Sequence, residues 1–153
     1  MTLKTGAKIA DFTAEGTGGP FSLSAIQGKK LVIYFYPKDN TPGCTSEAGD
    51  FRDLHAEFEK AGAIILGVSR DSLRSHEGFR AKLGLPFNLL SDPDETLCEL
   101  FGVMKLKNMY GKQVRGIERS TFLIDGSARL VREWRGVKVP QHAAEVLEAV
   151  RSL

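Results

Sequence analysis

Cys44 ends the segment Thr41-Pro42-Gly43-Cys44, which follows an apolar run that stops at Tyr36. In α/β proteins a ligand site is expected beyond the carboxyl end of a strand, where a helix begins. At such a place the partial positive charge of the helix end and its free backbone N–H groups favour the thiolate, which is the nucleophilic form. The position therefore predicts a reactive cysteine. The alternative is an inert, buried cysteine that packs as a small hydrophobe.

Thr41 stands where the first cysteine of a C-x-x-C redox motif would stand. Because threonine cannot close a local disulfide, this segment alone cannot carry out dithiol–disulfide exchange. Pro42 and Gly43 predict a tight turn that brings the Thr41 hydroxyl within reach of the sulfur or of a bound oxygen. The segment thus predicts an activated thiolate beside a hydroxyl.

The elements around Cys44 predict how it is positioned. Residues 31–36 are apolar, β-branched and aromatic, which is typical of a strand buried on both faces at the centre of a sheet. From Ala48 the apolar spacing becomes helical up to Ala61, and residues 63–68 form a second buried run. A strand, a helix and a strand in this order predict a right-handed parallel crossover, with Cys44 at the start of its helix.

The rest of the chain continues the alternation of strands and helices. We expect a hairpin loop at residues 16–20, a helix over 72–83, a short strand over 87–90, a helix from the Ser91–Glu95 segment to about Phe101, a hairpin of 121–124 with 128–134, and a terminal helix from Pro140. This order predicts an α/β fold with a mixed central sheet and helices on both faces. Residues 1–153 form one domain, because no repeat or linker divides them.

Composition excludes several other classes of protein. The formal charge of +2 is too small for a protein that binds nucleic acid through bulk charge, and two cysteines cannot form the disulfide framework of a small secreted fold. Three histidines and two cysteines, widely spread, predict no zinc or other metal site. The first residues show no signal peptide and no run could span a bilayer, so we expect a cytoplasmic protein without a membrane partner.

Other residues that could do chemistry have simpler interpretations. His55, His76 and His142 are predicted to be solvent-facing or half-buried helix residues. The basic residues between Lys105 and Arg119 include Tyr110, a combination that suggests nucleic-acid binding, but a flexible, solvated loop explains them more economically. Trp134 is predicted to belong to the core.

Longer stretches of the sequence resemble a known family in the same order along nearly the whole chain. The matching segments are residues 35–45 (FYPKDNTPGCT), 67–72 (GVSRDS), 89–94 (LLSDPD) and 116–125 (GIERSTFLID). They resemble the peroxiredoxins, and in particular the peroxiredoxin Q group, also called bacterioferritin comigratory protein. The resemblance implies a thioredoxin-like fold and a thiol-dependent peroxidase without a cofactor.

The resemblance also implies roles for individual residues. Cys44 would be the peroxidatic cysteine, Thr41 would orient the peroxide, and Pro37 and Gly43 would line the substrate pocket. Arg119 takes the place of the active-site arginine of the family. A guanidinium beside the sulfur would favour the thiolate and donate hydrogen bonds to peroxide oxygens.

The sequence departs from the family at the resolving cysteine. The two positions where members carry it are occupied by Gly49 and Arg80, which leaves only Cys98. Cys98 is interpreted as a packing residue of its helix, with a resolving role as the alternative. We therefore expect a one-cysteine cycle completed by thioredoxin, or by glutaredoxin with glutathione, and a monomer in the reduced state.

Two other functions remain open at this point. A thioredoxin-like binding or chaperone domain would leave Cys44 inactive or use it only as a redox sensor. A cysteine hydrolase would form an acyl adduct and would need a histidine base close to Cys44.

Overall fold

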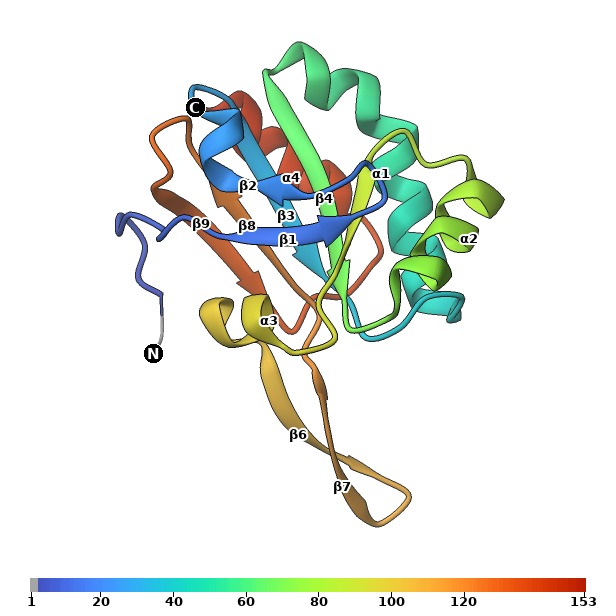
Figure 1. Ribbon diagram of the computed structural model, residues 1–153. Coiled ribbons are helices and arrows are strands. Elements are labelled where there is room, and N and C mark those ends of the chain that lie inside the picture. The colour runs from blue at the N-terminus through green and yellow to red at the C-terminus, as the bar shows by residue number, and fades with distance from the viewer. Residues whose placement is uncertain (1–2) are drawn as a thin grey trace.

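The computed structural model describes residues 3–153, so Met1 and Thr2 of the predicted domain lie outside the described residues. The centre of the fold is a seven-stranded sheet in the order β2-β1-β5-β4-β3-β8-β9 (Figure 1). Its strands are β1 (Thr13–Gly16), β2 (Phe21–Ser22), β3 (Lys30–Phe35), β4 (Ala63–Ser69), β5 (Asn88–Ser91), β8 (Ser120–Ile124) and β9 (Leu130–Arg135).

The predicted central strand is β3, which pairs with a parallel neighbour and an antiparallel one. On one side Phe35 lies opposite Val68 of β4, and on the other it lies opposite Ser120 of β8. The link from β3 to β4 is helix α1 (Pro42–Lys60), so the predicted crossover is confirmed. The sheet is mixed, as expected.

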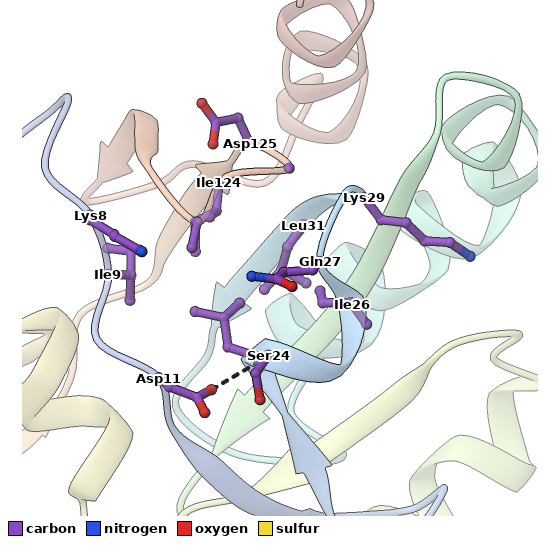
Figure 2. A pocket seen from close by; sticks show the side chains of 13 residues that line it. Lys8, Ile9, Asp11, Ser24, Ile26, Gln27, Lys29, Leu31, Ile124 and Asp125 are labelled. Atoms are coloured by element: carbon purple, nitrogen blue, oxygen red, sulfur yellow. Dashed lines mark hydrogen bonds between the residues drawn. The ribbon is translucent and has the colours of Figure 1, made fainter.

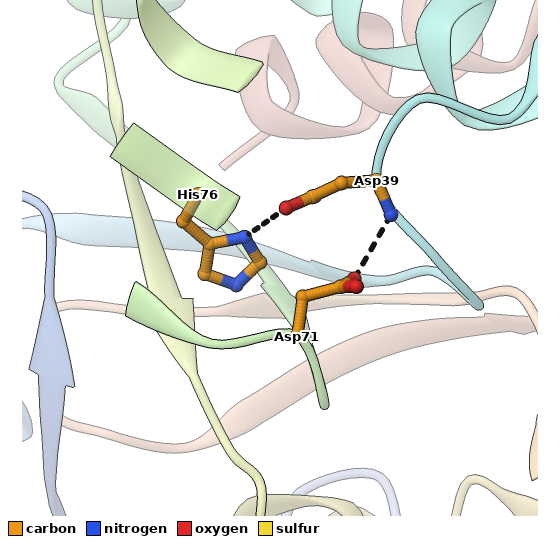
Figure 3. A group of neighbouring side chains, drawn as sticks. All are labelled: Asp39, Asp71 and His76. Atoms are coloured by element: carbon orange, nitrogen blue, oxygen red, sulfur yellow. Dashed lines mark hydrogen bonds and ion pairs between the residues drawn. The ribbon is translucent and has the colours of Figure 1, made fainter. Parts of the chain in front are cut away.

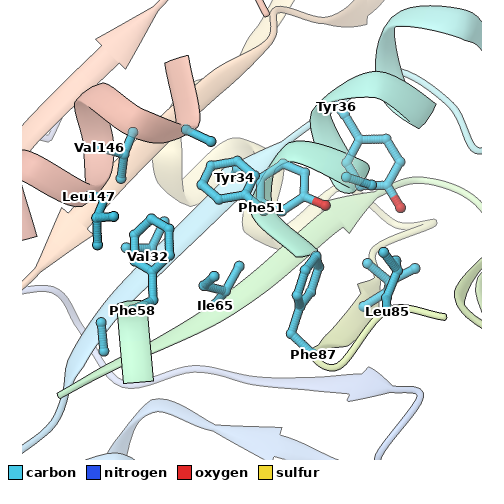
Figure 4. Packing of buried hydrophobic residues seen from close by; sticks show 14 of the residues in the cluster. Val32, Tyr34, Tyr36, Phe51, Phe58, Ile65, Leu85, Phe87, Val146 and Leu147 are labelled. Carbon is cyan, nitrogen blue, oxygen red and sulfur yellow. The ribbon is translucent and has the colours of Figure 1, made fainter. Parts of the chain in front are cut away.

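Helices cover both faces of this sheet, which confirms the predicted α/β class. The helical elements are η1 (Leu23–Ile26), α1, α2 (Leu73–Leu83), α3 (Thr96–Phe101) and α4 (His142–Arg151). Val32 and Tyr34 of β3 face the core beneath α1, α2 and α4 (Figure 4), whereas Leu31 and Ile33 face the core that holds α3. The alternation follows from the two-residue period of a strand. No helix within residues 3–153 has the length and apolar composition needed to cross a bilayer.

The third helix begins later than the sequence predicts. Ser91 ends β5, and α3 starts only at Thr96. The acidic residues still cap this helix, but from outside it: the Asp92 carboxylate accepts hydrogen bonds from the backbone N–H groups of Leu97 and Cys98. Asp92 thus satisfies free N–H groups of the first turn while its own segment forms the approach to the helix.

The expectation of a flexible loop between Lys105 and Arg119 is wrong. β6 (Met104–Met109) and β7 (Lys112–Ile117) form an antiparallel hairpin that projects away from the sheet (Figure 1). Ion pairs hold its base, because Arg115 contacts both Glu95 and Glu99. Several of its charges are therefore paired within the chain.

The two hairpins predicted from the sequence are present. β1 and β2 pair around the loop that ends at Pro20, with Thr13 opposite Ser22. β8 and β9 pair antiparallel, although β9 begins at Leu130, two residues later than expected, because Asp125 accepts hydrogen bonds from Ser127 and Arg129 in a wider loop.

Candidate active site

Cys44 lies in the first turn of α1, at the carboxyl end of β3. Thr41 is the residue that precedes the helix, and Pro42 takes the first helical position, where its lack of an N–H has no cost. The Cys44 side chain is 2% exposed. Its sulfur therefore lies at the positive end of a 19-residue helix and is largely shielded from water.

Arg119 is brought to Cys44 by the pairing of β8 with β3. It directly precedes β8, and its Nη2 lies 3.4 Å from Cys44 Sγ. Burial alone would lower the pKa of Arg119, but the neighbouring Glu47 and Cys44 raise it above its ordinary value. The guanidinium is thus a fixed positive charge beside the sulfur, as the sequence analysis expects.

Glu47 completes the cluster and was not singled out from the sequence. It lies one helical turn after Cys44, is 1% exposed, and accepts a hydrogen bond from Arg119 Nη1 at 2.7 Å. Burial raises the pKa of Glu47 to about 7, although the Arg119 guanidinium opposes this effect. The available signal was its spacing of three from Cys44, which places both residues on one face of α1.

Thr41 lies beside the helix start but does not bond the sulfur. Its hydroxyl donates to the carbonyl oxygen of Lys38 at 2.8 Å. Because that bond uses the hydroxyl hydrogen, the oxygen is left to accept a hydrogen bond from a peroxide O–H. Pro37, half-buried, opens the same loop.

Gly43 leaves room for the Arg119 side chain. A Cβ atom at residue 43 would lie 3.1 Å from Arg119 Nη2, which is closer than ordinary van der Waals contact. The glycine therefore allows the guanidinium to lie over the first turn of α1 next to the sulfur. The family resemblance implies that Gly43 lines the pocket, and the structure places it against Arg119.

Cys98, the other cysteine, is not near this cluster. It is fully buried in α3, within the core on the sheet face opposite α1. Burial and the nearby Asp92 raise the pKa of Cys98 well above its ordinary value, so it stays a neutral thiol. This environment agrees with its interpretation as a packing residue.

The prediction of solvent-facing or half-buried histidines is wrong for two of the three. His76 and His142 are buried, at 0% and 6% exposure, because each finds hydrogen-bond partners inside the fold. His76 bonds Asp39 and Leu90, while His142 bonds Thr121. His55, which is half-buried, pairs with Glu59.

These partners remove the case for a cysteine hydrolase. A hydrolase needs a histidine base beside its thiol. All three histidines are engaged elsewhere, and the charged partner of Cys44 is Arg119. Trp134, predicted as core, is half-buried and packs against the core that holds α1, and Arg132 lies over its ring at 4.5 Å.

A cavity of about 140 Å³ opens at the other end of β3 and is shown in Figure 2. It is lined in part by Lys8, Ile9, Leu31 and Ile124. Leu31 is at the amino end of β3, whereas Cys44 follows the carboxyl end. The cavity therefore lies away from the thiol.

Taken together, the cluster of Cys44, Arg119 and Glu47 suits attack by a thiolate on an electrophile that leaves as an anion. The helix end and the guanidinium stabilise negative charge on the sulfur first and on the departing atom later. The shielding of the sulfur selects a small reacting group.

Comparison with known proteins identifies the family to which the chain belongs. The AhpC/TSA family matches residues 5–132. Peroxiredoxin Bcp of Xanthomonas campestris pv. campestris is 59% identical over 135 residues, which cover 88% of this chain and 84% of that protein. Peroxiredoxin Bcp of Bacillus subtilis is 51% identical over 154 residues, covering 100% and 98%.

A solved structure of the Xanthomonas campestris bacterioferritin comigratory protein, described by its alkyl peroxide reduction activity, has a TM-score of 0.90 and 55% identity, covering 98% of this chain and 96% of that one. The expected thioredoxin-like fold is thus confirmed. The chain therefore belongs to the AhpC/TSA family, in its peroxiredoxin Q/Bcp group, and is a thiol-dependent peroxidase.

Proposed function

We propose that this chain reduces hydrogen peroxide and organic hydroperoxides at Cys44, which passes through a sulfenic acid and is restored by an external thiol. The observation that carries the proposal is the contact of 3.4 Å between Arg119 Nη2 and Cys44 Sγ at the start of α1. It puts a partly buried positive charge next to the sulfur of Cys44, which also lies at a helix N-terminus.

In the first step the Cys44 thiolate attacks the hydroxyl oxygen of the peroxide. The S–O bond forms as the O–O bond breaks, so sulfur is oxidised to the sulfenic acid and the peroxide is reduced. The second oxygen leaves with the electron pair as hydroxide or alkoxide and takes a proton to become water or an alcohol. Arg119 and the free N–H groups of the helix end stabilise this developing charge.

Thr41 is proposed to orient the peroxide. Its hydroxyl hydrogen is donated to the Lys38 carbonyl oxygen, so its own oxygen can accept a hydrogen bond from the peroxide. Thr41→Val removes that acceptor at nearly the same volume, and we expect the second-order rate constant for Cys44 oxidation to fall about 10²-fold. Thr45→Val, on the same helix start, is the matched control, and equal losses in both variants would contradict the role of Thr41.

The cycle is proposed to close without a second cysteine of this chain. One external thiol attacks the sulfenic acid to form a mixed disulfide and water, and a second thiol releases Cys44 as a free thiol. Thioredoxin, or glutaredoxin with glutathione, would supply these thiols. We propose further that the reduced protein is a monomer, for which sedimentation in reductant at micromolar concentration is the test.

The reaction at Cys44 is tested by mass spectrometry of protein treated with one equivalent of peroxide, with and without dimedone. A dimedone adduct on Cys44 that forms within the first turnover is the expected result. Cys44→Ser should lose peroxide turnover, because a hydroxyl is not ionised near neutral pH. Substantial turnover by that variant, or oxidation at Cys98 alone, would overturn the assignment.

The proposed range of peroxides is supported by the alkyl peroxide reduction named for the Xanthomonas campestris relative. Comparing hydrogen peroxide with tert-butyl hydroperoxide under the same thiol supply measures it. Turnover with both is expected. Turnover with hydrogen peroxide only would restrict the proposal to the smaller substrate.

A further inference from the structure

In the loop between β3 and α1, the side chain of Asp39 is buried between two exposed neighbours. Lys38 and Asn40 are exposed, whereas Asp39 is 4% exposed. Asn40 adopts a left-handed backbone with φ of +66°, a conformation that neighbouring contacts must stabilise. The loop carries Pro37 and Thr41 on its two ends.

Asp39 is held by an unusually complete set of donors. Its carboxylate accepts from Tyr36 Oη at 2.6 Å, from Ser75 Oγ at 2.8 Å and from His76 Nδ1 at 2.7 Å. Its own backbone N–H donates to Asp71 at 2.9 Å (Figure 3). Burial would raise the pKa of Asp39, but these hydrogen bonds outweigh it and leave the pKa below its ordinary value.

His76 is fixed at both ring nitrogens. Nδ1 faces the Asp39 carboxylate, and Nε2 lies 2.9 Å from the carbonyl oxygen of Leu90. The ring is thus held between a carboxylate oxygen and a carbonyl oxygen, and it forms a buried pair with Asp39. Asp39, Asp71 and His76 lie close enough to share a cation, but their atoms are already occupied by each other and by hydroxyl donors, so the cluster is a hydrogen-bond network.

This network joins the loop to a different part of the fold. Ser75 and His76 are in the first turns of α2, while Asp71 belongs to the turn between β4 and α2. A buried polar pair adds little net stability compared with an apolar pair of similar size, because its groups lose their hydration. What an apolar pair cannot supply is the fixed direction of several hydrogen bonds on a single carboxylate.

We propose that Asp39 and His76 are positioning residues for the peroxide step: their buried pair fixes the 37–41 loop on α2 and so places Pro37 and Thr41 over the Cys44 sulfur. This inference rests on the proposed reaction at Cys44. Neither residue touches the sulfur or the peroxide. Their effect is geometric, and displacements of about 1 Å can reduce a rate by about 10²-fold.

Two rates measured on the same variant distinguish a displacement of Thr41 and Pro37 from a change in the Cys44 thiolate. Oxidation of Cys44 by hydrogen peroxide depends on where Thr41 and Pro37 lie, whereas alkylation by iodoacetamide depends only on the thiolate and its access. In Asp39→Asn and in His76→Gln we expect peroxide oxidation to slow at least tenfold, whereas alkylation should not slow, because a displaced loop uncovers the sulfur. Charge alone predicts another result for Asp39→Asn, since loss of a negative charge near the site would speed both reactions.

The control and the second variant keep the test decisive. Asp53→Asn removes an exposed carboxylate from α1 and should leave both rates unchanged. The double variant of Asp39 and His76 should be no slower than the single ones, because the two residues act as a pair. If Asp39→Asn does not fold, Ser75→Ala removes one of its three donors and should show the same difference between the two rates, at about threefold.

Failure of the inference differs from failure of the proposed reaction. If wild-type Cys44 is not oxidised by peroxide, the proposed reaction is wrong and this inference falls with it. If wild-type Cys44 is oxidised but the Asp39 and His76 variants match it, or lose both rates equally, the two residues are not positioning residues for this step.

Discussion

Cys44 and Cys98 lie on opposite faces of the central sheet, so strands separate the two thiols of the chain. Cys44, in the first turn of α1, belongs to the same core as Val32 and Tyr34, while Cys98 belongs to the core that contains Leu31 and Ile33. A disulfide requires Cα atoms within about 7 Å of each other. To meet, the two cysteines would have to leave separate cores, and each exposed apolar side chain would cost about 1.5–3 kcal/mol.

Cys98→Ala is therefore expected to keep most of the peroxidase activity with glutaredoxin or a small thiol as reductant. Non-reducing peptide maps of the oxidised wild type should contain no Cys44–Cys98 link. A linked peptide that forms at the rate of turnover, with loss of recycling in Cys98→Ala, would instead show a two-cysteine enzyme.

Arg119→Met is expected to slow oxidation of Cys44 by about 10²–10³-fold, because it removes the charged donor 3.4 Å from the sulfur while keeping a long side chain. Alkylation by iodoacetamide near neutral pH should slow as well, since less of Cys44 would be thiolate. Arg151→Met, which removes an ion pair at the far end of α4, is the matched control. Unchanged alkylation in Arg119→Met would contradict the electrostatic part of its role.

Glu47 gives the protein a stability that depends on pH. Its pKa rises from 4.5 to about 7 in the fold because of burial, so the folded state binds the proton more tightly than the unfolded state. The resulting stabilisation is complete below about pH 4.5 and is lost as the pH rises through about 7. Relative to Glu47→Gln, the wild type should lose up to about 3 kcal/mol of unfolding free energy over that range.

Urea unfolding at several pH values measures this difference, with the exposed Glu77→Gln as control. Parallel pH profiles of the wild type and Glu47→Gln would mean that Glu47 titrates normally. Glutamine at position 47 can still accept the hydrogen bond from Arg119, so a difference in packing alone shifts the whole profile without changing its dependence on pH.

His142 has the opposite effect on stability. Burial lowers the pKa of His142 from 6.5 to about 4, so the unfolded state binds the proton more tightly. The contribution of His142 to the unfolding free energy is complete above about pH 6.5 and is lost as the pH falls through about 4. In His142→Gln, which can still bond Thr121, this acid-side loss of up to about 3 kcal/mol should disappear.

Urea unfolding at the same pH values tests this prediction for His142, with His55→Gln as the matched control. His55 is half-buried and pairs with Glu59 near the surface. If His55→Gln flattens the acid side as much as His142→Gln does, the assignment to His142 is wrong.

The strand and the helix that position Cys44 could be predicted from the sequence because they depend on local patterns of residues. The apolar run that forms β3 and the helical spacing after Ala48 are properties of neighbouring residues, and they place Cys44 at the start of α1 without reference to the rest of the chain. The position of Arg119 came from its resemblance to a family, since nothing in its neighbours indicates that β8 pairs with β3.

What could not be predicted is which polar residues meet inside the fold. Glu47 and Arg119 are 72 positions apart, and Asp39 and His76 are 37 apart, so no spacing rule connects them. A charged or imidazole side chain is buried only where a distant partner satisfies it, and the sequence alone does not show the partner. The β6–β7 hairpin could not be predicted for another reason. Its strands project from the body of the protein and lack a continuous apolar face.

Cys44 and Arg119 are 75 positions apart, and this separation matters while the chain is being synthesised. During synthesis Cys44 and its helix emerge well ahead of β8, and contacts between distant segments form late in folding. The nascent chain therefore carries the thiol without the guanidinium that activates it. The antiparallel pairing of β8 with β3 is the folding event that brings Arg119 to the sulfur, and unfolding that detaches β8 removes the guanidinium again.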